Sequence, residues 1–172
     1  KALEVAMAVE NGADEVDIVL NVGRMLTGEY DEAANEVEVI RTEMDDDVVL
    51  KVIIESGALK TPELIRKASL LSMLAGADFV KTSTGKIDVA ATPEAAVVMC
   101  QAIRDYYDKT GRKVGFKAAG GVRTAEDAAL YYTIVEEILG KEWLTTELFR
   151  IGASSAANNI LSAIEGSEVK YF

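Results

Sequence analysis

Residues 79–86 read FVKTSTGK, and the fold assigned to the whole chain depends on this stretch. It begins as a short apolar β-strand but places a lysine, Lys81, in the middle of that strand. Lysine is almost never fully buried without a partner, so two explanations are open. Either the strand lies at the edge of a sheet and Lys81 reaches water, or Lys81 occupies a dry interior where its amine has a chemical role.

Short β-rich segments alternate with apolar helical patterns along the chain. The β-rich segments are 15–21, 48–54, 78–83, 113–118 and 148–154. Helix starts are predicted at the Thr-Pro-Glu segments 61–63 and 92–94, and at Thr124 followed by Asp127. Five strands alternating with helices predict one α/β domain over residues 1–172, with a parallel sheet that is either doubly wound or closed as a barrel.

An internal repeat relates Lys81 to a second charged residue. NGADEVD at 11–17 and AGADFVK at 75–81 share a helix-ending glycine, then Ala-Asp, then a strand. Asp17 and Lys81 each lie five residues beyond their glycine. We therefore expect them to stand at the same height on two different strands.

Side-chain alternation places one ionisable residue on the same face of each of four strands. These residues are Asp17, Lys51, Lys81 and Lys117. The opposite face is apolar, as with Val114 and Phe116 beside Lys117, and fits a layer of helices. A surface explanation would need four edge strands, whereas a sheet has two edges. The charged faces converge only if the sheet curls, which predicts a barrel.

Composition narrows the possible chemistry and partners. The net charge of -11 repels nucleic acid and anionic membrane surfaces, and neither is expected as a partner. A single cysteine, Cys100, favours a reducing cytoplasm and is expected in the core. With no histidine in the chain, proton transfer must rely on Lys, Asp, Glu, Tyr or water.

A lysine cluster in a dry interior has a definite chemical use. Two neighbouring ammonium groups disfavour each other's protonation, so one amine can be neutral near pH 7 and attack a carbonyl. The resulting Schiff base, once protonated, permits carbon–carbon cleavage without a metal. Asp17 can balance the charge and pass protons through a water. A purely structural salt-bridge cluster is the alternative.

Two glycine-rich segments follow the last two strands. AGGVRT at 119–124 and IGASS at 151–155 each lie between a strand and a helix, where backbone amides can bind an anion. Arg123 adds positive charge to the first segment, and Ser154 and Ser155 add hydroxyls to the second. Barrels commonly bind phosphate at these two loops. A tight turn explains either segment alone, but the two together favour a phosphate site.

Five motifs together carry a resemblance to a known family. They are DEVDIVLN at 14–21, LKVIIESG at 50–57, DFVKTSTGK at 78–86, VGFKAAGGVRTAEDA at 114–128 and FRIGASS at 149–155. In this order they resemble the deoxyribose-phosphate aldolases, metal-independent class I aldolases with a TIM (β/α)8 barrel. The resemblance implies cofactor-free, reversible cleavage of 2-deoxy-D-ribose 5-phosphate to acetaldehyde and D-glyceraldehyde 3-phosphate.

The resemblance also implies roles for individual residues. Lys81 matches the Schiff-base lysine, Lys117 the second lysine that favours its neutral form, and Asp17 the proton-relay aspartate. The residues expected on the substrate side are Lys51, Thr84, Gly85, Lys86, Gly120, Gly121, Arg123, Gly152, Ser154 and Ser155. No metal ligand is implied. A C-terminal tyrosine reaches back to the active site in some family members, which makes Tyr171 a candidate for that role.

Two features depart from the family pattern. Ala118 follows the second lysine where the family usually has proline, which alters loop stiffness without removing a functional group. The chain also has five predicted strands, whereas a (β/α)8 barrel has eight and typically about 250 residues. We therefore expect strands four to eight of an aldolase that is incomplete at its N-terminus and forms a homo-oligomer, a dimer, when complete.

Two further functions stay open. A phosphate-binding fragment without catalysis would keep the glycine-rich loops but lack a closed pocket. Another Schiff-base barrel aldolase would use the same lysines on a different sugar phosphate. Trapping with acetaldehyde and borohydride separates the first from an aldolase, and a comparison of substrates addresses the second.

Overall fold

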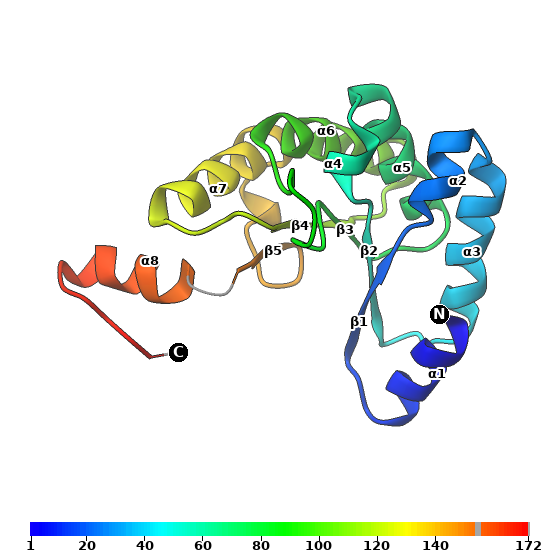
Figure 1. Cartoon of the computed structure of the whole chain (residues 1–172), viewed down its shortest axis with the longest axis horizontal. Helices are drawn as coiled ribbons and strands as arrows, with labels where there is room; N and C mark the ends of the chain where they lie inside the picture. The colour runs from blue at the N-terminus through cyan, green and yellow to red at the C-terminus, as the bar shows by residue number, and fades with distance from the viewer. Residues whose placement is uncertain (154–155, 172) are drawn as a thin grey trace.

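The computed structural model describes residues 1–153 and 156–171 and contains a curved sheet of five parallel strands (Figure 1). The strands are β1 (Glu15–Val19), β2 (Val49–Ile53), β3 (Phe79–Lys81), β4 (Gly115–Ala119) and β5 (Phe149–Gly152). They pair in sequence order, and every pairing is parallel. All five predicted strands are confirmed: four lie within the segments expected from the sequence, and β4 extends one residue beyond its segment, to Ala119.

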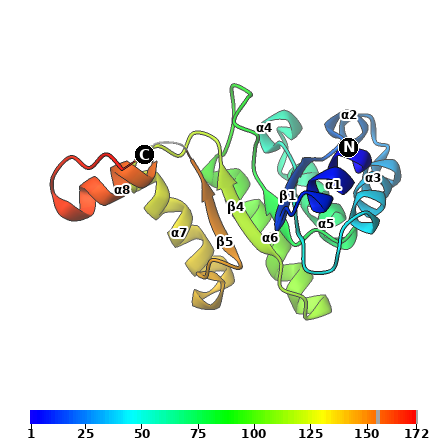
Figure 2. The same ribbon diagram turned by 90° about the horizontal axis from the view of Figure 1, so that it is seen from below.

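Helices connect successive strands and cover the outer side of the sheet, and one further helix precedes β1 and one follows β5 (Figure 2). They are α1 (Ala2–Glu10), α2 (Val22–Thr27), α3 (Tyr30–Thr42), α4 (Ser56–Leu59), α5 (Pro62–Leu74), α6 (Pro93–Thr110), α7 (Ala125–Leu139), the 3-10 helix η1 (Lys141–Trp143) and α8 (Ala156–Glu165). Within the described ranges, no helix has the length and apolar character that crossing a membrane requires.

The predicted helix starts are confirmed by their capping hydrogen bonds. The side chains of Thr61 and Thr92 each accept a hydrogen bond from the third residue beyond them, at 3.3 and 3.1 Å. Thr124 accepts from the Asp127 amide at 3.1 Å, and the Asp127 carboxylate accepts from the Thr124 amide at 3.0 Å. This reciprocal pair is a capping box. Helix entry is therefore encoded locally.

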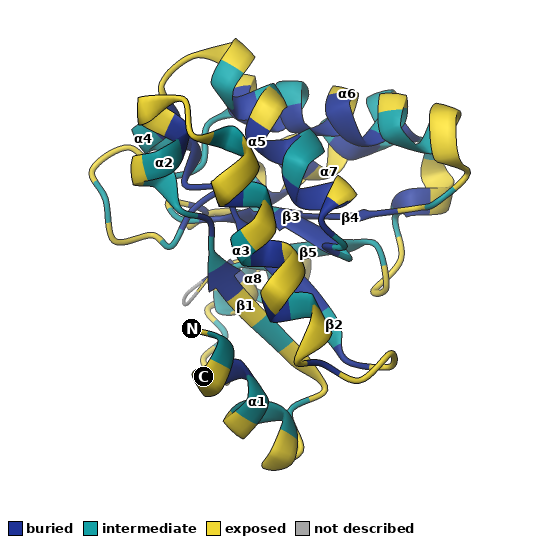
Figure 3. Cartoon of the chain, turned by 90° about the vertical axis from the view of Figure 1, so that its right-hand side faces the viewer, coloured by how far each residue is buried: buried dark blue, intermediate teal, exposed yellow. Residues whose placement is uncertain are grey.

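The hydrophobic core lies between the sheet and the helices (Figure 3). The outward residues of the strands are buried there, as alternation predicted, including Leu50, Val52, Val80 and Phe116. Cys100 on α6 is also buried in this core, as expected, and burial raises the pKa of its thiol. The core therefore uses one face of each strand and leaves the other face for polar groups.

The strand register explains how Asp17 and Lys81 come to the same level. By hydrogen-bonded pairing, Asp17 is opposite Lys51, and Lys51 is opposite Phe79, so Lys81 lies two residues further along its strand. Strands in a barrel are tilted, and eight strands with a shear of eight shift by about one residue per strand. A shift of two residues over two strands therefore places Asp17 and Lys81 in the same layer of the barrel, as the sequence predicted. In the hydrogen-bonded register, however, the position level with Asp17 on β3 is Phe79.

The curl of the sheet brings its two edge strands toward each other on the inside. β1 and β5 lie at opposite ends of the sheet, flanked by α1 and α8 (Figure 1). Even so, the inward side chain of Arg150 on β5 donates to the Glu15 carboxylate on β1 at 2.9 Å. The described residues thus form five strands of a partial α/β barrel. Side chains from both edge strands meet on its inner face.

Candidate active site

Two lysines share one carboxylate oxygen on the inner face of the sheet. The Nζ atom of Lys81 and the Nζ atom of Lys117 each lie 2.7 Å from Oδ2 of Asp17. The two nitrogens are therefore no further apart than twice that distance. Lys81 and Lys117 are paired in the β3–β4 ladder, so two neighbouring strands supply both amines and β1 supplies the carboxylate from across the interior.

Lys51 occupies a different place from the one that the sequence suggested. Its side chain is 2% exposed, and its Nζ atom lies 2.6 Å from Oε2 of Glu15 and 3.3 Å from Oδ1 of Asp17. The residues that line the neighbouring cavity do not include Lys51. The structure places Lys51 as a buried support for the two carboxylates rather than at the cavity wall.

Three residues that the sequence analysis missed form the layer beneath the lysines. Arg150 donates to both oxygens of Glu15, and its guanidinium carbon lies 5.8 Å from the centre of the Phe79 ring. Phe79 fits because a Cβ at Gly115 would lie 2.3 Å from its ring. Glu15 and Phe79 each lie two residues before a predicted inward residue, so side-chain alternation alone could have placed them on this face.

The charges of the inner face are unequal. Four basic side chains, those of Lys51, Lys81, Lys117 and Arg150, face two carboxylates, those of Glu15 and Asp17. Partial burial raises the pKa of the Asp17 carboxyl, but hydrogen bonds from Lys117 and Lys81 outweigh burial and lower the pKa to about 2. The hydrogen bond from Lys51 likewise lowers the pKa of Glu15. This excess of basic groups over carboxylates on the inner face attracts an anion.

A cavity of about 430 Å³ lies above the lysines and brings together most of the predicted site residues. Its walls come from Lys81, Thr84, Gly85, Lys86, Lys117, Ala119, Gly120, Gly121, Val122, Arg123, Gly152 and Ala153. The cavity is therefore bounded by the ends of β3, β4 and β5. Ser154 and Ser155 lie outside the described residues.

Different structural constraints require glycine at different positions of the cavity wall. Gly120 and Gly121 have φ values of +90° and +84°, in the left-handed region that favours glycine. A Cβ at Gly152 would lie 2.8 Å from the Cβ of Ala119 and 3.4 Å from Cε of Lys117. Glycine at position 152 therefore leaves room for the second lysine, a role that the sequence analysis did not anticipate.

Several loop amides that could bind an anion already have partners. The amides of Arg123 and Thr124 donate to the Asp127 carboxylate at 2.9 and 3.0 Å. The amides of Gly85 and Lys86 donate to side-chain hydroxyls of their own loop. Anion binding at this cavity would therefore depend more on the Lys86 and Arg123 side chains than on a row of open amides.

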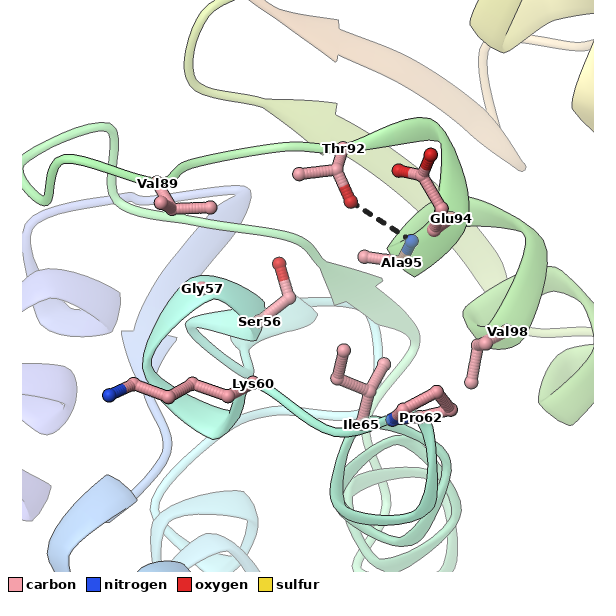
Figure 4. Close-up of a pocket in the computed structure, with 10 residues that line it drawn as sticks. All are labelled: Ser56, Gly57, Lys60, Pro62, Ile65, Val89, Thr92, Glu94, Ala95 and Val98. Atoms are coloured by element: carbon pink, nitrogen blue, oxygen red, sulfur yellow. Dashed lines mark hydrogen bonds between the residues drawn. The ribbon is translucent and has the colours of Figure 1, made fainter.

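Two other parts of the chain lie apart from the lysines. The side chain of Tyr171 is largely exposed, and Tyr171 is not among the residues that line the cavity. A separate pocket of about 370 Å³ lies between α4, α5 and the start of α6 (Figure 4). Lys60 and Glu94 are its charged lining residues, and none of the three inner-face lysines reaches it.

Comparison with known proteins agrees with this arrangement. Residues 1–158 match the model of the DeoC/LacD family aldolases. Proteins named deoxyribose-phosphate aldolase from Mus musculus and Homo sapiens are 49% and 47% identical to this chain over 157 residues. Those alignments cover 91% of this chain and 49% of each relative, so the chain spans about half the length of the curated relatives it matches.

A solved structure supports the same assignment. The crystal structure of a candidate deoxyribose-phosphate aldolase from Coccidioides immitis matches with a TM-score of 0.79 and 32% identity. This match covers 95% of the present chain and 58% of the other chain. The family model spans most of the chain, and the resemblance drawn from the sequence motifs is confirmed: the chain belongs to the DeoC/LacD family of aldolases.

Proposed function

We propose that these residues carry the catalytic lysines of a class I aldolase that reversibly cleaves 2-deoxy-D-ribose 5-phosphate to acetaldehyde and D-glyceraldehyde 3-phosphate. The observation that carries the proposal is the single Asp17 oxygen shared at 2.7 Å by Lys81 and Lys117. The names of the mammalian relatives support the choice of substrate. In this proposal Lys81 is the nucleophile.

The proposed reaction begins at the aldehyde carbon of the open-chain sugar. The neutral amine of Lys81 adds to that carbon, and loss of water leaves a protonated Schiff base. Transfer of the 3-hydroxyl proton to a base then breaks the bond between carbons 2 and 3, with its electrons moving into the Schiff base. D-Glyceraldehyde 3-phosphate leaves, carbon 2 of the enamine is protonated, and hydrolysis releases acetaldehyde and the amine.

The neighbouring residues have complementary roles in this scheme. Lys117 places a second basic group beside Lys81 at the shared Asp17 carboxylate and helps to prepare Lys81 for attack on the aldehyde. Asp17, whose pKa is about 2, is ionised near pH 7 and balances the iminium charge while relaying protons through a water. Lys86 and Arg123 line the same cavity and supply positive charge for the substrate phosphate.

The nucleophile is tested by trapping it in the complete protein. With acetaldehyde and borohydride, we expect an ethyl group to be fixed on the peptide that contains Lys81, as located by mass spectrometry. Label on Lys117 or Lys51 with Lys81 unmodified would show that the nucleophile is wrongly assigned. No label on any of the three would favour a phosphate-binding protein without aldolase chemistry. Preferential cleavage of another sugar phosphate over 2-deoxyribose 5-phosphate would show that the proposed substrate is wrong.

A further inference from the structure

Glu55 is a buried acidic residue that the proposed reaction does not use. It lies between the end of β2 and the start of α4, and it is 6% exposed. Its backbone has φ +53° and ψ +59°, a left-handed conformation that is uncommon outside glycine. Burial and a left-handed backbone at one ionisable residue are costly and persist when the surrounding contacts require them.

Those contacts all lead to the loop that follows β3. The Glu55 carboxylate accepts a hydrogen bond from the hydroxyl of Ser83 and one from the hydroxyl of Thr84 at 2.6 Å. It also accepts from the Thr84 amide at 3.2 Å. Among the described residues no lysine, arginine or N-terminus forms a salt bridge with Glu55. Hydrogen-bond donors from one loop therefore offset the cost of burying its charge.

The carboxylate also fixes the next residues of the loop through the hydroxyl groups of Ser83 and Thr84, each of which bonds both to Glu55 and to a later backbone amide. A carboxylate can only accept hydrogen bonds, so both hydroxyls must donate to it and keep their lone pairs for other donors. Ser83 Oγ accepts from the Gly85 amide at 3.0 Å, and Thr84 Oγ1 accepts from the Lys86 amide at 3.2 Å. One buried carboxylate thus determines the direction of four hydrogen bonds and the backbone path up to Lys86.

This backbone path sets one wall of the cavity. Thr84, Gly85 and Lys86 line the cavity, and a Cβ at Gly120 would lie 3.1 Å from the Cα of Gly85. The loop is therefore in close contact with the glycine-rich segment after β4. A displacement of the loop by an ångström would move Lys86 relative to Arg123, which lines the same cavity.

Lys81 depends much less on Glu55. Its ammonium group is held by Asp17, and its backbone belongs to the β-ladder with β2 and β4. We propose that Glu55 is a positioning residue for recognition of the substrate phosphate: through Ser83 and Thr84, its carboxylate holds Lys86 at the cavity wall. This inference rests on the proposed function, and it separates phosphate recognition from Schiff-base formation within one site.

The test is Glu55→Gln in the complete protein. Glutamine has the same shape but replaces one acceptor oxygen with an NH₂ donor, which faces the donors of the loop. Loss of charge-assisted hydrogen bonds predicts that KM for 2-deoxyribose 5-phosphate rises about 10-fold or more. We expect kcat, cleavage of unphosphorylated 2-deoxyribose and borohydride trapping of Lys81 with acetaldehyde to stay within about 3-fold of wild type.

Matched variants separate the loop from general effects. Glu94→Gln removes an exposed carboxylate at the start of α6 and should change none of these quantities. Thr84→Val removes the hydroxyl and should reproduce part of the rise in KM, and Thr84→Ser, which restores a hydroxyl, should reverse most of that rise relative to Thr84→Val. The Thr84 pair also tests the relay if Glu55→Gln does not fold. Arg123→Ala provides the reference effect of removing a phosphate contact.

Each outcome decides the inference. Equal losses with phosphorylated and unphosphorylated substrates, or loss of Lys81 trapping, would mean that Glu55 supports the whole site and would overturn it. A rise in KM for Arg123→Ala with none for Glu55→Gln or Thr84→Val would also overturn it. If wild-type Lys81 cannot be trapped, the proposed function fails separately. Calorimetric titration with inorganic phosphate then tests Glu55, because weaker binding in Glu55→Gln than in Glu94→Gln supports the inference and equal binding refutes it.

Discussion

The two faces of strand β4 carry side chains of opposite character. Phe116 points outward and is fully buried beneath the helices, whereas Lys117 points inward and shares the Asp17 carboxylate with Lys81. The same alternation holds on β2 and β3. The comparison shows that the two faces of one strand serve different purposes: the outer face packs in the hydrophobic core, and the inner face holds the groups that we propose to be reactive.

This separation has a physical basis in the period of the strand. Successive side chains point to opposite faces, so a residue can change on one face without changing the packing on the other. The outer face is stabilised by the burial of apolar surface. The inner face contains ion pairs, whose net contribution to stability is small when desolvation is included. Variants on the two faces should therefore change different measurements.

The largest effect is expected from Phe116→Ala on the outer face. Removal of a fully buried aromatic side chain typically costs about 3–5 kcal/mol of unfolding free energy, because it leaves a cavity in the core. Denaturant unfolding of the complete protein measures this loss, with Phe116→Leu as a milder control. Folded Phe116→Ala should still form the Lys81 adduct with acetaldehyde. A loss below about 1 kcal/mol, or folded protein that cannot form the adduct, would contradict the separation of the two faces.

A smaller effect, on activity rather than on stability, is expected from Lys117→Leu on the inner face. This change removes the basic group that lies beside Lys81 and shares the Asp17 carboxylate with it. It should lower kcat/KM near pH 7 about 100-fold, equivalent to roughly 2.7 kcal/mol of transition-state free energy. Steady-state kinetics measures the effect, with the exposed Lys109→Leu on α6 as control. Unchanged kcat/KM in Lys117→Leu would rule out a role for Lys117 in the reaction.

The smallest effect is expected from the titration of Asp17. Hydrogen bonds from Lys117 and Lys81 overcome the opposing effect of burial and lower the pKa of Asp17 from 3.8 to about 2. The carboxylate therefore stabilises the fold above about pH 4, and this contribution is lost as the pH falls toward 2. The side chain is 26% exposed, so after allowance for solvent screening we expect a loss of about 1 kcal/mol.

Comparison with Asp17→Asn isolates this contribution. The difference in unfolding free energy between the wild-type protein and this variant should be constant from pH 5 to 7 and should shrink below about pH 4. Urea denaturation at a series of pH values measures it. A difference that stays constant down to pH 3, or that shrinks already near pH 5, would show that the carboxylate is not held as the structure describes.

Much of the fold and of the candidate site could be predicted from local sequence patterns. Capping at Thr61, Thr92 and Thr124 depends on residues three positions apart, and strand alternation depends on a period of two. These rules placed Lys81 and Lys117 on one face of the sheet. No tertiary information was needed, because the geometry of a helix start or a strand is fixed by its own backbone.

The sequence did not indicate how Lys51 and Glu55 are used. Lys51 was expected near the substrate, but Glu15 and Asp17 enclose its ammonium group inside the sheet. Glu55 contacts a loop 28 and 29 residues further along the chain, and no spacing rule relates such distant positions. Their partners are set only when neighbouring strands pair and the loops after them meet.

The sequence by itself determined the order of strands and helices, the helix caps, and which strand residues share a face. The tertiary structure decided which of those residues touch. Sheet curl brings Arg150 within 2.9 Å of Glu15 across 135 residues of sequence, and the stagger of the strands brings Asp17 to both Lys81 and Lys117. The physical reason is that backbone geometry repeats locally, whereas curl and stagger arise from the packing of the whole sheet under its helices.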